Sequence, residues 1–403
     1  MDKVLDYINK NFKCCVKLNR HDDGDLIGLP YEYTVPSVEC FNELYYWDTY
    51  FTNIGLLKCG LENLAKSNTD NILYMVNKYG YMPNGNRTYY LCASQPPFLS
   101  LMVRDIYEFF SDAAWLFGAY HELKKEYDFW CTRRITEIGL CQYGEDFADE
   151  EEAKNYANGY IERSGVGRGE DIKKLSRQAI SSGESGWDMN PRWGTDAVNY
   201  VQVDLNSLIY MLEDNMAYFA KVLENGEHDM WKSRAKKRKE LMQKYLDRGD
   251  GLLTDYNFVS GKHSNVVSVA CLYPMFANLT DEKNTEAVIK ILGQLEAPHG
   301  VYTCEKNDVP GSYQWNYPNG WPCLQYIAVM AMDKNGYYDI ALQIAKKYTS
   351  LVESVFESTG KLWEKYNVLD GSINVVNEYK MPSMMGWSAG VYIALREYIE
   401  QHQ

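Results

Sequence analysis

Residues 45–80, "YYWDTYFTNIGLLKCGLENLAKSNTDNILYMVNKYG", contain two amphipathic segments joined by a short turn. On both sides of Gly60, apolar side chains recur at intervals of three and four, which is the spacing of one helix face. Glycine suits a helix end because it adopts left-handed backbone angles without a steric penalty. The stretch therefore predicts a helical hairpin rather than a pair of strands.

The same hairpin format recurs along the whole chain, although the residues themselves do not repeat. The first helices of the hairpins are expected to begin near residues 43, 97, 204, 263, 317 and 384. The lack of self-similar residues disfavours a solenoid, and the lack of alternating strand runs disfavours a parallel sheet. We predict an all-α fold, an (α/α)6 barrel in which six hairpins close into a ring.

The widest interval between hairpins lies between the second and the third. It contains residues 134–186, with the glycine-rich stretch "RSGVGRGED" at 163–171. We expect this segment to be an insertion over the mouth of the barrel, so that residues 1–403 form a single catalytic domain.

Composition narrows the classes of partner. A net charge of −14 argues against nucleic acid and anionic membranes, which require a basic face. Tyrosine and tryptophan are abundant, at 34 and 10 residues, and their flat faces with polar edges suit the stacking and hydrogen bonding of sugars. A small neutral carbohydrate is therefore the expected substrate.

Cysteine spacing and the N-terminal segment bear on metal binding and location. The ten cysteines form no CxxC pair, and the six histidines are scattered, so no metal or cofactor is expected. "HDDGD" at 21–25 lacks calcium-loop spacing and is interpreted as an exposed turn. Because the first 20 residues contain no continuous apolar run, reduced thiols and a cytoplasmic location are predicted.

Two loops carry carboxylates among aromatic residues. "ESGWDMNPRW" at 184–193 contains Asp188, and "LWEKYNV" at 362–368 contains Glu364. Glycoside hydrolysis requires one protonated carboxyl group and one ionised carboxylate. Tryptophan neighbours raise the pKa of a carboxyl group by burial, which suits Asp188 as the acid. Lys365 favours an ionised Glu364, which would activate a water molecule.

A series of motifs in order resembles that of the trehalase family of glycoside hydrolases. The motifs are "CFNELYYWDTYF", "PNGNRTYYLCASQPPF", "ESGWDMNPRW", "VDLNSLIY", "QWNYPNGWP", "EKYNV" and "NEYKMPSMMGW". They cover nearly the whole chain, from about residue 36 to 391. The resemblance implies the (α/α)6 barrel, inversion at the anomeric carbon, Asp188 as general acid and Glu364 as general base. The two carboxyl groups would then lie about 6.5–9.5 Å apart.

The resemblance also implies a set of substrate-binding residues, carried over position by position. Trp47, Trp315 and Trp387 are expected to stack on sugar rings, and Asp48 to bridge sugar hydroxyls as an ionised carboxylate. The complete set is Phe41, Trp47, Asp48, Asn84, Gln95, Arg168, Glu170, Trp187, Arg192, Gln314, Trp315, Glu378 and Trp387.

Two arginines of the family pattern are missing here. Cys40 replaces one, and Ala93 and Ser94 stand where the other is expected. Arginine supplies a rigid fork of donors that neither residue can replace. Trehalose is therefore expected to bind poorly unless a cation from residues 134–186, Arg163 or Arg168, restores the site.

Two alternative functions remain open at this level. A glucosylglycerate- or mannosylglycerate-type hydrolase on the same fold would need a cation facing the substrate carboxylate, for which Arg168 and Arg192 are candidates. A non-catalytic sugar-binding protein is disfavoured because both Asp188 and Glu364 are present.

Overall fold

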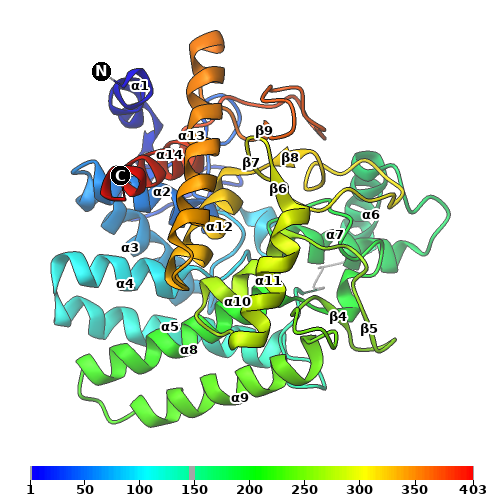
Figure 1. Cartoon of the computed structure of the whole chain (residues 1–403). Coiled ribbons are helices and arrows are strands. Elements are labelled where there is room, and N and C mark those ends of the chain that lie inside the picture. The colour runs from blue at the N-terminus through cyan, green and yellow to red at the C-terminus, as the bar shows by residue number, and fades with distance from the viewer. Residues whose placement is uncertain (1, 145–149, 403) are drawn as a thin grey trace.

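A closed ring of helices forms the centre of the molecule. The computed structural model describes residues 2–144 and 150–402. Within these residues, six inner helices follow one another around the ring, each packed against the next, and the last closes onto the first (Figure 1). They are α2 (Tyr46–Lys58), α4 (Leu99–Phe110), α8 (Val203–Val222), α10 (Tyr273–Phe276), α12 (Pro322–Lys334) and α14 (Gly386–Gln401).

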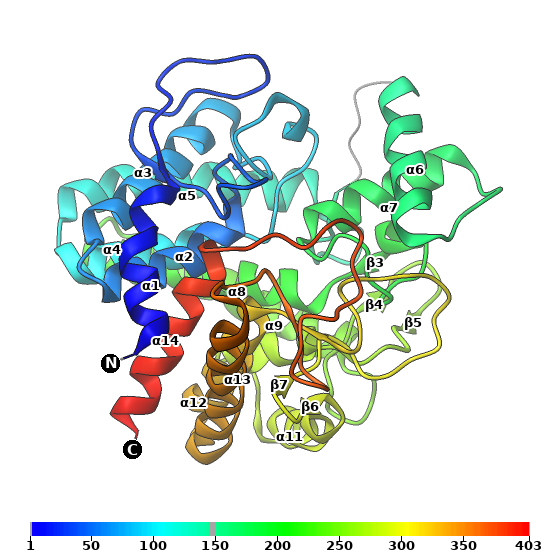
Figure 2. The same ribbon diagram turned by 90° about the horizontal axis from the view of Figure 1, so that it is seen from above.

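A second layer of helices covers the ring from outside. It consists of α3 (Glu62–Tyr79), α5 (Ala113–Arg133), α9 (His228–Leu246), α11 (Glu282–Leu295), α13 (Tyr338–Thr359) and α1 (Lys3–Asn11). The N-terminal α1 completes this layer beside the C-terminal α14 (Figure 2), where the ring of Tyr7 packs against that of Phe356 on α13. The predicted (α/α)6 barrel is confirmed. None of the described helices is long and apolar enough to span a membrane.

Sequence explains how the ring closes. Gly55 on α2 faces Gly390 on α14, and a methyl group at either position would overlap the backbone of the other helix. The two helices approach closely because neither has a side chain there. The fourth inner helix is shorter than the sequence predicts, since residues 269–272 form a 3-10 turn and α10 ends before Asn278, which has a φ of 53°.

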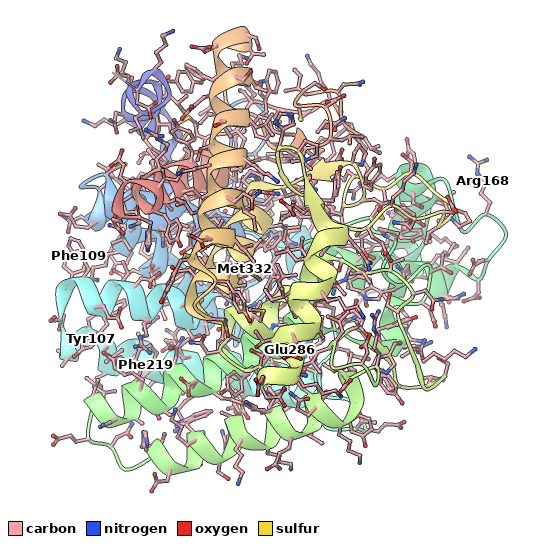
Figure 3. All side chains as sticks on the ribbon, in the orientation of Figure 1. Tyr107, Phe109, Arg168, Phe219, Glu286 and Met332 are labelled. Carbon is pink, nitrogen blue, oxygen red and sulfur yellow. The ribbon has the colours of Figure 1, made fainter. Side chains whose placement is uncertain are left out.

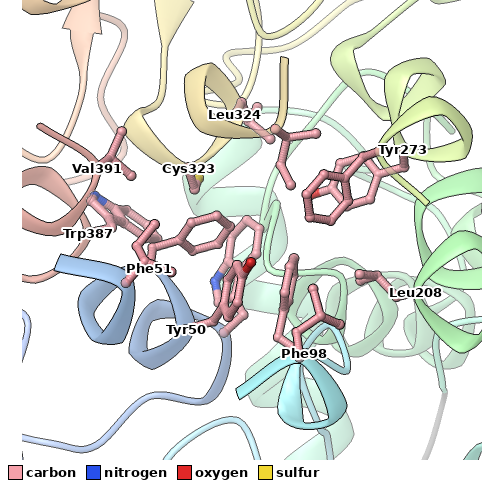
Figure 4. Packing of buried hydrophobic residues seen from close by; sticks show 14 of the residues in the cluster. Tyr50, Phe51, Phe98, Leu208, Tyr273, Cys323, Leu324, Trp387 and Val391 are labelled. Atoms are coloured by element: carbon pink, nitrogen blue, oxygen red, sulfur yellow. The ribbon is translucent and has the colours of Figure 1, made fainter. Parts of the chain in front are cut away.

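The centre of the ring is filled by side chains. Figure 4 shows Tyr50, Phe98, Leu208, Tyr273 and Leu324, which come from five different inner segments, meeting in one cluster. Buried apolar area is the main favourable term in folding, so this cluster holds the inner helices together. The barrel is therefore a packed core with a site at one end and not an open channel.

Short antiparallel strands join the loops around the ring. They are β1 (Val16–Lys17) with β2 (Tyr33–Thr34), β3 (Tyr200–Val201) with β4 (Tyr256–Asn257) and β5 (Lys262–His263), β6 (Glu296–Ala297) with β7 (Gly300–Val301), and β8 (Asn319–Gly320) with β9 (Tyr366–Asn367). In the last pair Gly320 lies opposite Tyr366. This register brings the loop before α12 alongside the loop that carries Glu364.

An additional helix pair stands beside the ring. α6 (Glu150–Ser164) and α7 (Ile172–Glu184) pack on each other, away from the outer layer (Figures 1 and 2). They bury a small cluster of their own, in which Tyr160 and Leu175 meet Tyr313. This pair lies within the predicted insertion at 134–186, of which residues 145–149 lie outside the described residues.

Candidate active site

A cavity of about 550 Å³ lies where the loops of the ring meet α6 and α7. Ten of the residues predicted from the sequence line it. They are Phe41, Trp47, Asp48, Asn84, Gln95, Asp188, Gln314, Trp315, Glu364 and Trp387. The two expected catalytic residues and most of the expected sugar-binding residues thus share one pocket.

Tryptophan side chains form one wall of this pocket. The rings of Trp315 and Trp321 are parallel, with centroids 3.7 Å apart, and Trp187 stacks on Trp315 at 5.5 Å. Trp47 and Trp387 close the cluster at 5.7 to 6.3 Å from Trp315. Because each ring holds its neighbours in place, the wall is rigid. Trp187 itself is fully buried and does not line the pocket, so it supports the wall from behind.

The loop that carries Asp188 turns at Gly186. This residue has a φ of 73°, and a methyl group there would lie 2.8 Å from the ring of Trp47. Only glycine fits both the backbone angle and the close approach. Gly186 therefore allows Asp188 to follow directly after the buried Trp187.

Glu364 is held on both of its carboxylate oxygens. The Nζ of Lys365 lies 2.6 Å from Oε2, and the hydroxyl of Tyr379 donates to Oε1 at 2.6 Å. The Lys365 side chain is fully buried, and its ammonium lies over the ring of Trp321. The indole of Trp387 donates to the backbone carbonyl of Glu364 at 3.1 Å. The carboxylate thus has a compensating charge and a fixed orientation.

Asp188 is more open and belongs to a different network. Its carboxylate lies 2.7 Å from Nη2 of Arg163, which comes from α6 and also contacts Glu378. The Nε of Arg163 donates to Oε2 of Glu378 at 2.8 Å. The Glu378 side chain is fully buried behind this contact, and burial raises its pKa to about 7, partly offset by Arg163. Arg163 therefore bridges the predicted acid and a second carboxyl group.

Asp48 lies in the first turn of α2 and is buried. Burial, together with the charges of Glu364 and Asp188, raises its pKa to about 8. Both predicted catalytic carboxylates are therefore close enough to Asp48 to act on it electrostatically. At neutral pH Asp48 is mostly protonated and can donate a hydrogen bond, whereas the sequence suggested an ionised carboxylate.

Amide side chains supply polar groups at the same cavity. Oε1 of Gln95 accepts from the backbone nitrogen of Trp47 at 3.2 Å, and Nδ2 of Asn84 donates to the carbonyl of Gly183 at 3.4 Å. Oε1 of Gln314 is buried and has no hydrogen-bond partner among residues 2–144 and 150–402. A buried acceptor without a partner is costly, so a bound hydroxyl group would satisfy it.

Three of the predicted binding residues lie away from the pocket, and Arg192 is the most deeply buried of them. Its guanidinium lies between the rings of Trp187 and Trp193, at 4.5 and 4.6 Å from their centroids. It lies 2.8 Å from Asp204 and 2.9 Å from Asp255. Its positive charge is therefore balanced by two carboxylates, and these ion pairs hold the loop in place. Arg192 was expected to contact the sugar, but it lies away from the pocket.

Arg168 and Glu170 also differ from the expectation. Both are exposed, and Glu170 pairs with Lys174 at 2.7 Å. Figure 3 shows Arg168 at the outer edge of the α6–α7 pair. Gly165, Gly167 and Gly169 all have positive φ angles, so the turn between the two helices loops away from the cavity.

Several lining residues were absent from the binding set expected from the sequence, although Arg163 was considered there as a replacement cation. Tyr156, Tyr160 and Arg163 line the pocket from α6, and Tyr379 lines it from the loop before α14. The first three are spaced at four and three residues, which places them on one face of a helix. This spacing is the sequence signal from which the three residues could have been assigned to one helix face. Of the two cations considered as replacements for the missing arginines, Arg163 reaches the pocket and Arg168 does not.

The positions of the missing arginines are not equivalent. Ala93 lines the pocket, whereas Cys40 is exposed and does not.

The carboxylates of the acidic turn at 21–25 make local hydrogen bonds. Asp22 accepts from the backbone nitrogen of Gly28, and Asp25 accepts from the hydroxyl of Thr88. Among the described residues there is no group of three or more histidine, cysteine or acidic side chains placed to hold a metal ion.

Curated relatives of this chain are trehalases. A periplasmic trehalase of Xanthomonas campestris pv. campestris (strain B100) is 31% identical over 395 residues, covering 92% of this chain and 69% of the relative. A periplasmic trehalase of Pseudomonas aeruginosa is 30% identical over 400 residues, covering 92% of this chain and 72% of the relative. These relatives contradict the predicted cytoplasmic location, which was wrong because free cysteines and the N-terminal residues do not report the compartment.

Solved structures agree with the sequence relatives. Neutral trehalase from Saccharomyces cerevisiae is 26% identical with a TM-score of 0.77, covering 92% of this chain and 74% of that chain. A mannosylglycerate hydrolase from Thermus thermophilus, with 15% identity and a TM-score of 0.64, covers 98% of both chains and shares the fold. The trehalase family profile matches residues 4–400. The chain therefore belongs to the trehalase family of glycoside hydrolases.

Proposed function

We propose that this protein hydrolyses the α-glucosidic bond of a small neutral disaccharide, with trehalose as the first candidate. The observation that carries the proposal is the meeting of Asp188 and Glu364 in one cavity of about 550 Å³, beside a wall of stacked tryptophans. Flat aromatic faces bind the C–H faces of sugar rings, while carboxylates and amides bind their hydroxyls.

Glu364 is the general base. It forms an ion pair with the buried Lys365, and the hydroxyl of Tyr379 fixes its orientation. An ionised carboxylate in a fixed orientation accepts a proton from a water molecule as that water attacks the anomeric carbon. Inversion requires space for this water between Glu364 and Asp188, and the separation of about 6.5–9.5 Å between their carboxyl groups stays a prediction.

Asp188 is the general acid and must carry a proton when the glycosidic bond breaks. In the structure its carboxyl group forms an ion pair with Arg163, whereas a general acid must be neutral before it donates its proton. Binding of the sugar resolves this conflict if substrate hydroxyls take the guanidinium donors of Arg163. Glu378, on the other side of Arg163, then retains the second contact. Release of Asp188 from Arg163 is thus coupled to substrate binding.

Arg163 also distinguishes between neutral and anionic substrates. It occupies the pocket in place of the family arginines missing at Cys40 and Ala93, and this supports trehalose binding through a different cation. Its charge is already balanced by Asp188 and Glu378. An additional carboxylate on the substrate would face an excess of negative charge. This balance favours a neutral disaccharide over a glucosylglycerate or mannosylglycerate.

A substrate panel with product analysis tests the proposal. Trehalose, kojibiose, maltose, sucrose and glucosylglycerate are incubated with the full chain, and released glucose is measured. Proton NMR during the first minutes identifies the anomer that forms. Rapid turnover of trehalose is expected, with β-glucose from the ring that water attacks and α-glucose from the leaving ring formed in equal initial amounts. Exclusive turnover of glucosylglycerate would contradict the substrate class, and initial release of α-glucose alone from trehalose would contradict the inverting mechanism.

A further inference from the structure

Two cysteines outside the sugar pocket are brought together by a tight reversal of the chain. Cys131 lies in the last turn of α5, and residues 134–142 then double back. The backbone nitrogen of Gln142 donates to the carbonyl of Arg134 at 2.8 Å, and Ile135 pairs with Cys141 as an antiparallel bridge. As a result, the thiols of Cys131 and Cys141 lie close enough to influence each other, while Sγ of Cys141 donates to the carbonyl of Trp130 at 3.3 Å.

A buried arginine donates hydrogen bonds to both sulfur atoms. The guanidinium of Arg238, on α9, donates from Nη2 to Sγ of Cys131 at 3.5 Å and from Nη1 to Sγ of Cys141 at 3.7 Å. Arg238 is itself held by Glu213 at 2.9 Å. A fixed cation beside a thiol stabilises its thiolate, which is the nucleophilic form in disulfide exchange.

The two thiols differ in a way that suits sequential reaction. The interaction with Cys141, followed by the charge of Arg238, lowers the pKa of Cys131, whereas the pKa of Cys141 is raised. Cys131 is partly exposed and Cys141 is fully buried. An external disulfide can therefore reach Cys131 first, and Cys141 is positioned to react with the product.

We propose that Cys131 and Cys141 are a redox-active dithiol that is oxidised by low-molecular-weight disulfides such as glutathione disulfide. The Cys131 thiolate attacks one sulfur of glutathione disulfide, forming a mixed disulfide and releasing one glutathione thiolate. Cys141 then attacks Sγ of Cys131, and the second glutathione leaves as a thiolate that takes up the proton of Cys141. Two thiols are oxidised to one disulfide, and one glutathione disulfide is reduced to two glutathione molecules.

The test uses the folded full-length chain. Protein is incubated with glutathione disulfide, free thiols are blocked with N-ethylmaleimide, and peptides are mapped by mass spectrometry without reduction. Two of the ten thiols are expected to be lost to a Cys131–Cys141 linkage that dithiothreitol reverses. Cys40, an exposed thiol on another part of the chain, serves as the internal control and is expected to form only a mixed disulfide with glutathione.

Two variants separate the roles of the cysteines. C141S is expected to stop at the mixed disulfide on Cys131, and C131S is expected to leave Cys141 unreacted. A wild-type protein in which Cys131 stays unmodified, or keeps glutathione as the final product, would overturn the proposal. So would a Cys131 whose alkylation by iodoacetamide reaches half its maximal rate at the same pH as that of Cys40.

Discussion

The two sides of the sugar pocket are built in different ways. On the barrel side, Glu364 takes hydrogen bonds from its chain neighbour Lys365 and from Tyr379, and its side chain is 3% exposed. On the side of α6, Asp188 depends on Arg163 for its ion pair, and the side chains of both are 34% exposed. The predicted base is therefore fixed by the barrel alone, whereas the predicted acid depends on the added helix pair.

This difference bears on the roles proposed for the two residues. As the proposed base, Glu364 needs no rearrangement, because its contacts with Lys365 and Tyr379 are already formed. As the proposed acid, Asp188 must exchange its contact with Arg163 for a proton, and the substrate itself can drive that exchange. Variants on the two sides should therefore fail in different ways.

The largest effect is expected from the catalytic carboxyl groups. E364Q and D188N should each lower kcat on trehalose by about 10²–10⁴-fold, since each removes one proton transfer. Steady-state kinetics provide the measurement, and circular dichroism checks that both variants are folded. Full activity of either variant would remove that residue from the mechanism.

A substrate with a good leaving group distinguishes the two variants. α-Glucosyl fluoride needs little protonation to depart, so D188N should retain much more activity on it than on trehalose, relative to wild type. E364Q should lose activity on both substrates, because attack by water still requires the base. Equal losses for the two variants on both substrates would contradict the assignment of the roles.

Stability should depend strongly on the buried Arg192. R192M would leave Asp204 and Asp255 buried without their cation. Removing one partner from a buried ion pair costs about 3–5 kcal/mol. Urea unfolding of R192M should show a loss of that order. R248M is the matched control, because Arg248 and its partner Asp250 are both partly exposed, and equal losses would show that burial is not the deciding factor.

Arg163 should affect substrate binding more than stability. R163K keeps the charge but loses the planar fork that contacts Asp188 and Glu378 together, and we expect kcat/KM on trehalose to fall about 10–100-fold. R168K, five residues away on the exposed turn, should stay within about twofold of wild type. An equal effect of both substitutions would show that the pocket arrangement of Arg163 is unimportant.

A pH-dependent effect on stability is expected from Asp48. Because burial raises the pKa of Asp48 to about 8 in the folded protein, ionisation is harder there than in the unfolded chain. The stability associated with the protonated group is present below about pH 4 and is lost as pH rises towards 8, by up to about 1.4 kcal/mol per pH unit. D48N cannot ionise, so its free energy of unfolding should fall less steeply with pH. Parallel pH profiles for the two proteins would contradict the raised pKa.

The order of the helices could be predicted from the sequence because it depends on local periodicity. Five of the six inner helices begin within five residues of the expected positions, for example α8 at Val203 and α14 at Gly386. The fourth was misjudged, since the apolar run that begins at Val266 is not helical until the 3-10 turn at 269–272, and α10 begins only at Tyr273. Apolar composition alone cannot distinguish a buried strand-like segment from a buried helix.

Sequence by itself determined the ring of hairpins, the family and the loops that carry Asp188 and Glu364. Tertiary structure decided which charged residues reach the sugar pocket. Arg163, Arg168 and Arg192 are the same type of residue, but their places in the structure differ. Arg163 lies in the pocket, Arg168 is exposed on a glycine-rich turn, and Arg192 is buried between two carboxylates. The physical reason is that helical periodicity and turn residues act over a few positions, whereas an ion pair depends on partners that are distant in the sequence.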